Sequence, residues 1–241
     1  MWIGLVGSEM CIRDRVELAK DRERCEKNIG YIQMIEARSG IPAMDAWTSE
    51  LIETGYLHNH ARMWYASIWI HTLKLPWTLG AEFFLRHLLD GDVASNTLSW
   101  RWVAGLHTLG KFYLAQKSNI CKFTAGRLEV NIPLATESAL VETGQRIATP
   151  KRLPSYDKAI PNGRIGLLIQ EEDLSAVNWL SDRYELVAVA GLFSSAAYRK
   201  YGIEESVIKF RSDCMRSALP EKAEIFSLSL IHISEPTRPI H

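Results

Sequence analysis

Amides, carboxylates and one guanidinium are concentrated between residues 59 and 96 of this 241-residue chain. The set comprises Asn59, Arg62, Asp90, Asp92 and Asn96. Six of the chain's eight tryptophans lie in the overlapping stretch from Trp47 to Trp102. Indole rings beside a compact group of such side chains suit a large planar redox cofactor with a polar tail. The residue types therefore predict a site for a cofactor of this kind.

Helices are predicted to position this set, because the stretch from Arg22 to about Arg127 has a helical pattern with few helix-breaking residues. The expected helices run from Pro42 to Gly55, from about His58 to Leu75, from about Thr78 to Leu89, and from about Ala94 onward. Asn59 and Arg62 are three residues apart, so they would share one face of the second helix. The DGD turn at residues 90–92 would separate the third helix from the fourth.

The order and spacing of these residues resemble the FAD-binding domain of the DNA photolyase/cryptochrome family, from about Gly40 to Gly105. The resemblance is carried by TGYLHNHARM at residues 54–63, by Pro76-Trp77, and by LLDGDVASNTLSWRW at residues 88–102. It implies a mainly α fold, namely part of a helical photolyase-type FAD-binding domain, followed by a short truncated α/β segment.

The resemblance also implies which residues contact FAD. They are Tyr56, Asn59, Arg62, Asp90, Asp92 and Asn96. In the family the arginine pairs with the first aspartate of the DGD turn, the second aspartate meets the flavin ring edge and ribityl chain, and the asparagine faces flavin N5. The alternative is that Asp90 and Asp92 merely cap the following helix. Both roles are compatible, because a capping carboxylate has a second oxygen.

Electron transfer is the chemistry that the resemblance implies, with Trp100, Trp77 and Asn96 as its catalytic residues. Trp100 and Trp77 match the proximal and middle tryptophans of the family's electron relay. The distal position falls on Arg24, which cannot serve, so the relay either ends at Trp77 or leaves through another ring. The candidates for that ring are Trp64, Trp69 and Tyr65. The alternative is that the indoles simply pack a helical core, and we favour it for Trp47, Trp64 and Trp69.

The implied substrate is DNA damaged by pyrimidine dimers. Asn59 and Met63 match photolyases that repair cyclobutane dimers rather than (6-4) photoproducts. His60 replaces the arginine that usually contacts the DNA backbone. The residues expected to face the substrate are Asn59, His60, Met63 and Trp102.

We therefore expect a photolyase-like lyase that transfers an electron from light-excited reduced FAD to cyclobutane pyrimidine dimers. One alternative is a cryptochrome-like blue-light receptor that repairs nothing. Another is an inert fragment with an incomplete flavin pocket, because the family's phosphate contacts would lie upstream of the residues present.

Composition adds modest bounds. The 28 basic and 28 acidic residues balance, so affinity for DNA must come from a local patch. The basic and aromatic residues at 111–127 could supply one, although a solvated amphipathic helix pair is as good an interpretation. No apolar run approaches the length of a membrane span. The cysteines Cys25, Cys121 and Cys214 have neither disulfide nor metal spacing and fit a reducing cytoplasm.

Three further segments complete the predicted organisation, in which the helical FAD-binding part covers residues 16–130. Residues 131–162 are rich in turn formers and are predicted to be a linker. Residues 163–226 alternate two short buried strands, at 164–170 and 185–190, with helices at 175–180 and 203–218, which predicts the start of a parallel α/β unit.

The two ends of the chain, residues 1–15 and 227–241, are expected to be artefacts. One set of codons for LVGSEMCIRDR at residues 5–15 has a reverse complement that translates as LSLIHISEPT, which begins at Leu228. The pair resembles an adapter of transposon-based sequencing libraries translated in both directions. We therefore leave both ends out of the fold prediction.

Overall fold

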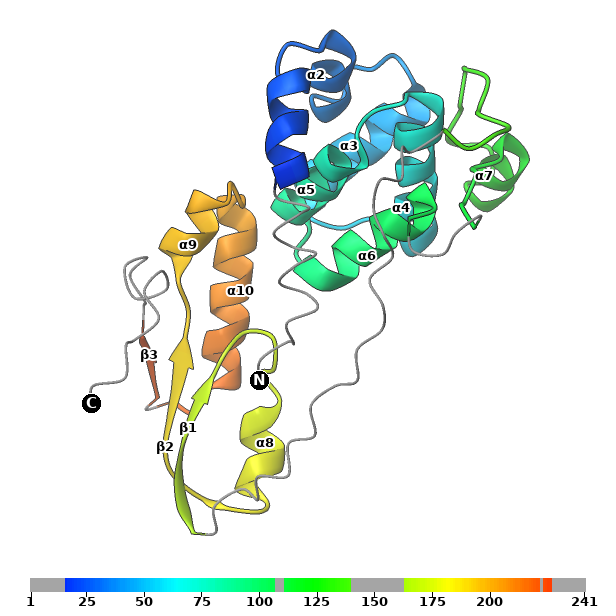
Figure 1. Cartoon of the computed structure of the whole chain (residues 1–241). Helices are drawn as coiled ribbons and strands as arrows, with labels where there is room; N and C mark the ends of the chain where they lie inside the picture. Colours follow the sequence, from blue (N-terminus) through cyan, green and yellow to red (C-terminus); the bar gives the residue numbers. More distant parts are fainter. Residues whose placement is uncertain (1–15, 107–110, 140–162, 222, 227–241) are drawn as a thin grey trace. The chain divides into compact units, whose positions relative to one another are not determined.

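The computed structural model describes residues 16–106, 111–139, 163–221 and 223–226. The chain separates into two compact units, Met1–Pro154 and Ser155–His241 (Figure 1). Both predicted adapter-derived ends, and the predicted linker from residue 140 onward, lie outside the described residues.

The first unit is helical, which confirms the expected mainly α fold. A helix over residues 16–25 is followed by α2 (Ile29–Ile35), α3 (Pro42–Thr54), α4 (Asn59–Ser67), the π-helix η1 (Ile68–Thr72), α5 (Trp77–His87), α6 (Val93–Ala104) and α7 (Lys117–Phe123). Helix α3 begins at Pro42 and ends before Gly55, whose φ of 70° is the left-handed cap conformation, as predicted.

The helix predicted from His58 to Leu75 is interrupted. Its α-helical part ends at Ser67, and a π-helical turn continues to Thr72. The amide of Leu73 bonds the carbonyl of Ile68, five residues earlier, and Lys74 has a positive φ of 56°. The predicted end at Leu75 was therefore wrong, because the chain leaves the helix before Pro76 can terminate it. Such π turns are rare and often occur at functional sites.

Aromatic side chains dominate the core of the helical unit. Trp47, Tyr65, Trp69, Phe84 and Trp100 are among its largest fully buried side chains. Burial of each aromatic side chain is strongly favourable, so α3 to α6 are held together chiefly by these rings. The core thus places several oxidisable rings close together.

Residues 131–139, predicted to begin the linker, instead lie along the helical unit. The side-chain amide of Asn131 donates to the carbonyl of Gly40 at 3.0 Å. The amide of Ala135 donates to Thr72 Oγ1 at 3.1 Å, and that of Ala139 donates to His71 Nδ1 at 3.1 Å. The prediction failed here because turn-forming composition does not reveal backbone bonds to distant helices.

The second unit is a three-stranded parallel sheet in the order β1-β2-β3, with β1 at Arg164–Ile169, β2 at Glu185–Leu192 and β3 at Glu224–Phe226. Its helices are α8 (Ala176–Ser181), α9 (Ser195–Lys200) and α10 (Glu205–Ala218). The parallel α/β pattern matches the prediction, but most residues of β1 and β2 are not buried. Leu167 and Leu186 join the core, whereas Leu168 and Val187 are exposed, because successive strand residues point to opposite faces.

The described residues add little about location or metals. Cys25, Cys121 and Cys214 are free thiols, and only Cys25 is buried. Within the described ranges no cluster of three or more His, Cys, Asp or Glu side chains could hold a metal ion. No helix in that part of the chain combines the length and apolar character that a membrane crossing requires.

Candidate cofactor site

A cavity of about 490 Å³ lies among α4, α5 and α6 (Figure 1 shows the three helices). This volume is within the range of small-molecule sites, roughly 300–1,000 Å³. Five of its lining residues are the polar set predicted from sequence, Asn59, Arg62, Asp90, Asp92 and Asn96. Trp100 and Phe84 also line it. The fold therefore brings together groups that are up to 37 positions apart in the chain, counted from Asn59 to Asn96.

Arg62 is held in a fixed position at the cavity. Its Nε donates to the carbonyl of Leu57 at 2.7 Å, and its Nη2 lies 3.0 and 2.9 Å from the two carboxylate oxygens of Asp90. This is the pairing that the resemblance implied. The Asp90 side chain is 56% exposed, so the ion pair contributes little to stability and serves mainly to orient the guanidinium.

Asp92 caps helix α6. Its Oδ1 accepts a hydrogen bond from the amide of Ser95 at 2.6 Å, which satisfies one of the free N–H groups of the first turn. Its Oδ2 accepts no hydrogen bond from the described residues. The carboxylate therefore has one oxygen for the helix and one for a ligand in the cavity.

Asn96 is oriented by the neighbouring helix. Its Nδ2 donates to the carbonyl of Ala81 in α5 at 2.7 Å. Because a carbonyl only accepts, the nitrogen of the amide must face Ala81. The Oδ1 atom makes no hydrogen bond with the residues that the structure describes, and it remains an acceptor at the cavity wall.

The indole of Trp100 forms the apolar side of the cavity. It is 2% exposed and lies against Gly80 of α5 so closely that a Cβ there would overlap the ring. Its ring makes edge contacts with Phe84 at 5.1 Å and with Trp69 at 6.1 Å between centroids. A planar ligand in this cavity would thus meet an oxidisable ring that belongs to a larger aromatic cluster.

The predicted substrate residues Met63 and Trp102 also line the cavity. Trp102 is 41% exposed and stacks on Tyr113, with ring centroids 5.9 Å apart and planes 25° apart. The exposed Trp102 ring, backed by the partly buried Tyr113, provides a surface beside the cavity on which another flat group can stack.

Three predicted site residues do not line this cavity, namely Tyr56, His60 and Trp77. Tyr56 is exposed and lies under the Arg62 guanidinium, 5.6 Å from its ring centroid. His60 stacks on Trp64 at 5.8 Å and contacts Phe123 of α7 at 5.7 Å. Tyr56 and His60 are therefore next to the cavity rather than in its wall. Tyr56 precedes α4, and the His60 ring packs against Trp64 and Phe123.

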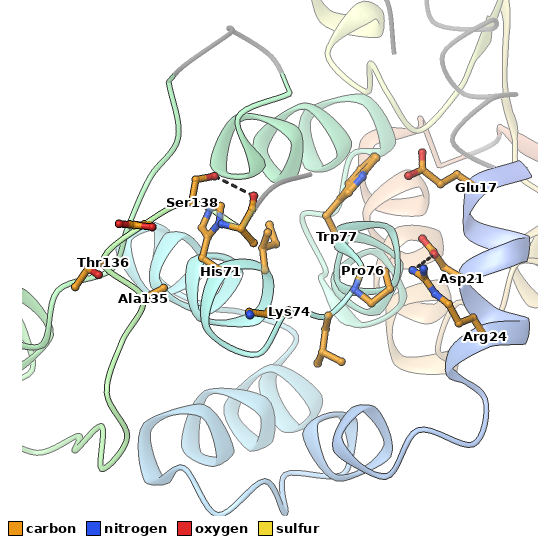
Figure 2. Close-up of a pocket in the computed structure, with 14 residues that line it drawn as sticks. Glu17, Asp21, Arg24, His71, Lys74, Pro76, Trp77, Ala135, Thr136 and Ser138 are labelled. Carbon is orange, nitrogen blue, oxygen red and sulfur yellow. Dashed lines mark hydrogen bonds and ion pairs between the residues drawn. The ribbon is translucent and has the colours of Figure 1, made fainter. Parts of the chain in front are cut away.

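Trp77 lies at a second, larger cavity of about 1,000 Å³ (Figure 2). Figure 2 shows the ion pair of Arg24 with Asp21 on one side of Trp77, and His71 on the other. Trp77 is the first residue of α5, one helical turn before Gly80. Among the described residues, however, Trp77 makes no ring contact with another aromatic side chain. The guanidinium of Arg101 lies 5.5 Å from its ring centroid.

His71 is buried, and both of its ring nitrogens are hydrogen-bonded. Its Nδ1 accepts from the amide of Ala139, so its Nε2 carries the proton and donates to the carbonyl of Val103 at 3.0 Å. Burial lowers the pKa of His71 from its ordinary value, and the hydrogen bond to Val103 partly opposes that shift.

Sequence reasoning missed one residue that shapes the site, Gly80, which admits the Trp100 ring. A glycine inside a predicted helix is a signal of close packing and could have identified Gly80. Trp69 was a candidate relay ring for which a core role was favoured; it is buried and also contacts Trp100.

The chain is similar to known proteins. Residues 11–124 match the model of the FAD binding domain of DNA photolyase. A 70-residue segment is 49% identical to a deoxyribodipyrimidine photo-lyase of Streptomyces griseus and covers 29% of this chain. Segments of 89 and 101 residues are 36% and 35% identical to proteins of the same name from Escherichia coli and Vibrio cholerae, covering 36% and 42% of this chain. These segments span 15%, 19% and 22% of the three relatives.

Proposed function

Since residues 11–124 of this chain belong to the photolyase/cryptochrome family through its FAD-binding domain, we propose that the cavity among α4, α5 and α6 is this chain's share of the flavin site. The observation that carries the proposal is the convergence of five polar side chains on one cavity whose apolar side is Trp100. Neither a cap nor a packed core requires that arrangement.

The donors and acceptors of the cavity fit a flavin. Arg62 and Asn59 can donate to ring carbonyls, the free Asp92 oxygen can accept from a hydroxyl or ring N–H, and Asn96 Oδ1 can accept from a ring N–H. Phe84 and Trp100 offer apolar surface to a planar ring. The residues present therefore hold the ring and part of its polar tail.

Bound reduced flavin would supply the light-driven electron that splits a cyclobutane pyrimidine dimer in DNA. The chain's own residues have two tasks. Trp100 delivers electrons to the cavity from the aromatic cluster that it contacts. Asn59, Met63 and Trp102 form the part of the wall that faces the lesion.

The aromatic pair Trp102–Tyr113 supports a nucleic-acid substrate. Bases taken out of a duplex stack on exposed aromatic rings, each stacked base contributing about 1–3 kcal/mol. Photolyases are among the enzymes known to act on an extruded base. Lys111 and Lys117 are exposed near this pair in sequence and can attract the phosphate backbone, while His60 can donate to a phosphate.

The decisive experiment is repair of cyclobutane dimers by the full-length protein, with its flavin reduced chemically, under blue light and at low salt. Low salt preserves the contribution of a local basic patch. We expect multiple turnovers. Absence of repair, with FAD bound and DNA associated, would instead favour a blue-light receptor.

A first test needs only the present chain. Titration with FAD should quench the cofactor's fluorescence, because Trp100 lies at the cavity wall and donates an electron to the excited flavin. Trp100→Phe should bind FAD with similar affinity and restore much of the fluorescence. If FAD fluorescence is the same with saturating protein as without protein, the proposed site is contradicted.

A further inference from the structure

Trp100 has a continuous aromatic connection to the surface that does not pass through Trp77. Its ring contacts Trp69 at 6.1 Å, with the planes at 84°. Trp69 in turn contacts Tyr31 of α2 at 5.9 Å, with the planes at 88°. Trp100 and Trp69 are buried, whereas Tyr31 is only partly buried. The row therefore leads from the cavity wall outward.

Trp69 is better placed than Trp77 to carry positive charge after losing an electron. The Trp69 Nε1–H donates to the carbonyl of Pro76 at 2.8 Å, and an indole cation strengthens such a bond. The Nε1 of Trp77 is buried and has no hydrogen-bond partner among the described residues. The Arg101 guanidinium over the Trp77 ring also disfavours a second positive charge there.

Two tyrosines contact Trp69, and their surroundings differ. Tyr65 stacks on Trp69 at 5.9 Å but is fully buried, with its hydroxyl 3.0 Å from Thr48 Oγ1. A tyrosine releases its proton when it is oxidised, and Thr48 is no base. Tyr31 is partly exposed, so water can take its proton. Burial raises the pKa of Tyr31, but the nearby charges of Arg86 and Arg22 oppose that effect and favour proton release.

We propose that Trp69 and Tyr31 conduct electrons from the surface to Trp100, with Tyr31 as the outer end of the relay. The inference rests on the proposed function in one respect, namely that a flavin in the cavity is the oxidant. Tyr31 supplies the oxidisable outer end of the relay. Arg24, which occupies the family's distal relay position, cannot supply it.

The electron balance is simple. Trp100 loses one electron to the light-excited oxidised flavin. Trp69 then gives one electron to Trp100, and Tyr31 gives one electron to Trp69 while its hydroxyl proton passes to water. The net change is one electron from Tyr31 to the flavin and one proton to solvent. A soluble thiol in the medium restores Tyr31 by giving up one hydrogen atom.

The test places the oxidant in the cavity covalently, so that it does not depend on FAD affinity. A maleimide flavin is attached at Ser99→Cys, an exposed cavity residue, in the 241-residue chain carrying Cys11→Ser, Cys121→Ser and Cys214→Ser. The sample is illuminated with blue light, frozen, and examined by electron paramagnetic resonance. Ring-deuterated tyrosine identifies a tyrosyl signal by the change in its hyperfine structure.

We expect a tyrosyl signal in the parent protein, its loss in Tyr31→Phe, and its retention in the matched control Tyr65→Phe. Trp69→Phe should also abolish the tyrosyl signal. Because Tyr31→Phe removes only one hydroxyl, the test of the proposal does not depend on whether Trp69→Phe folds. The proposal is overturned if the parent forms only tryptophan radicals or if the tyrosyl signal persists in Tyr31→Phe. Failure of untethered FAD to bind would contradict the proposed function alone.

Discussion

The ring of Trp100 rests directly on the backbone of Gly80, so that a Cβ at residue 80 would overlap Cη2 and Cζ3 of the indole. Helix α5 and helix α6 approach each other at this point, and the contact fixes the position of the cavity wall. The glycine is therefore required by packing and not by backbone conformation.

Gly80→Ala should destabilise the helical unit by about 1–3 kcal/mol, the usual cost of overfilling a packed core. The matched control is Gly30→Ala in α2, where the added Cβ meets only Asn28 Oδ1 at 3.3 Å. Gly30→Ala should alter the free energy of unfolding by less than about 1 kcal/mol, because the helix favours alanine over glycine by about that amount and the added Cβ overlaps no packed ring. Denaturant unfolding followed by tryptophan fluorescence measures both. Equal midpoints for the two variants would show that the Trp100 contact is not tight.

Asp92 has a capping role that can be separated from cofactor binding. Asp92→Ala should cost about 1 kcal/mol through loss of the α6 cap, whereas Asp92→Asn should cost almost nothing because asparagine caps equally well. If the second oxygen of Asp92 binds the flavin as a carboxylate, Asp92→Asn should still weaken FAD binding. Thermal unfolding of the two variants measures the contribution of the cap to stability, and FAD titration measures the contribution of the carboxylate to FAD affinity. A cap alone predicts unchanged FAD affinity in Asp92→Asn.

Asp90→Ala leaves Arg62 without its carboxylate partner. Because the pair is largely exposed, unfolding free energy should change by less than about 1 kcal/mol. Affinity for FAD should nevertheless fall about tenfold, near the contribution of one charge-assisted hydrogen bond. Asp90→Asn retains one acceptor oxygen and should show a smaller loss. A large drop in stability without a change in FAD affinity would mean that the pair is structural.

Trp100→Phe separates electron supply from catalysis in the full-length protein. Phenylalanine keeps most of the packing but is much harder to oxidise, so blue-light reduction of oxidised flavin by an external reductant should slow strongly while FAD remains bound. Protein whose flavin is already reduced chemically should repair dimers as the parent does. Loss of repair in that chemically reduced variant would show that Trp100 has another role.

Stability of the helical unit should decrease in acid. Burial, followed by the charge of Arg86, lowers the pKa of His87 to about 4, and burial lowers that of His71. The unfolded chain binds protons on both groups below about pH 6.5, before the folded chain does. Unfolding free energy should therefore fall as the pH drops from about 6.5 towards 4, and His87→Gln should reduce that slope. An identical slope in His87→Gln would show that other groups govern the acid response.

Local sequence predicted most of the helices, because their signals are local. Pro42 and Gly55 mark the ends of α3. Helix α5 ends at His87, three residues before the DGD turn, and Asp92 of that turn caps α6. The π turn after Ser67 was not predicted in this way, because the bond from the Leu73 amide to the Ile68 carbonyl has no signal in the spacing of residue types.

The sequence by itself placed Asn59 and Arg62 on one helical face, and Asp90, Asp92 and Asn96 at a turn and the start of the next helix. That these two groups meet in one cavity was implied only by the family resemblance. Tertiary structure alone decided how the polar side chains are oriented and that the Trp100 ring lies at the cavity wall. The carbonyl of Ala81 orients Asn96, and the absence of a side chain at Gly80 admits Trp100. These contacts join residues of different helices. They depend on the distance and angle between the helices, which one-dimensional spacing does not contain.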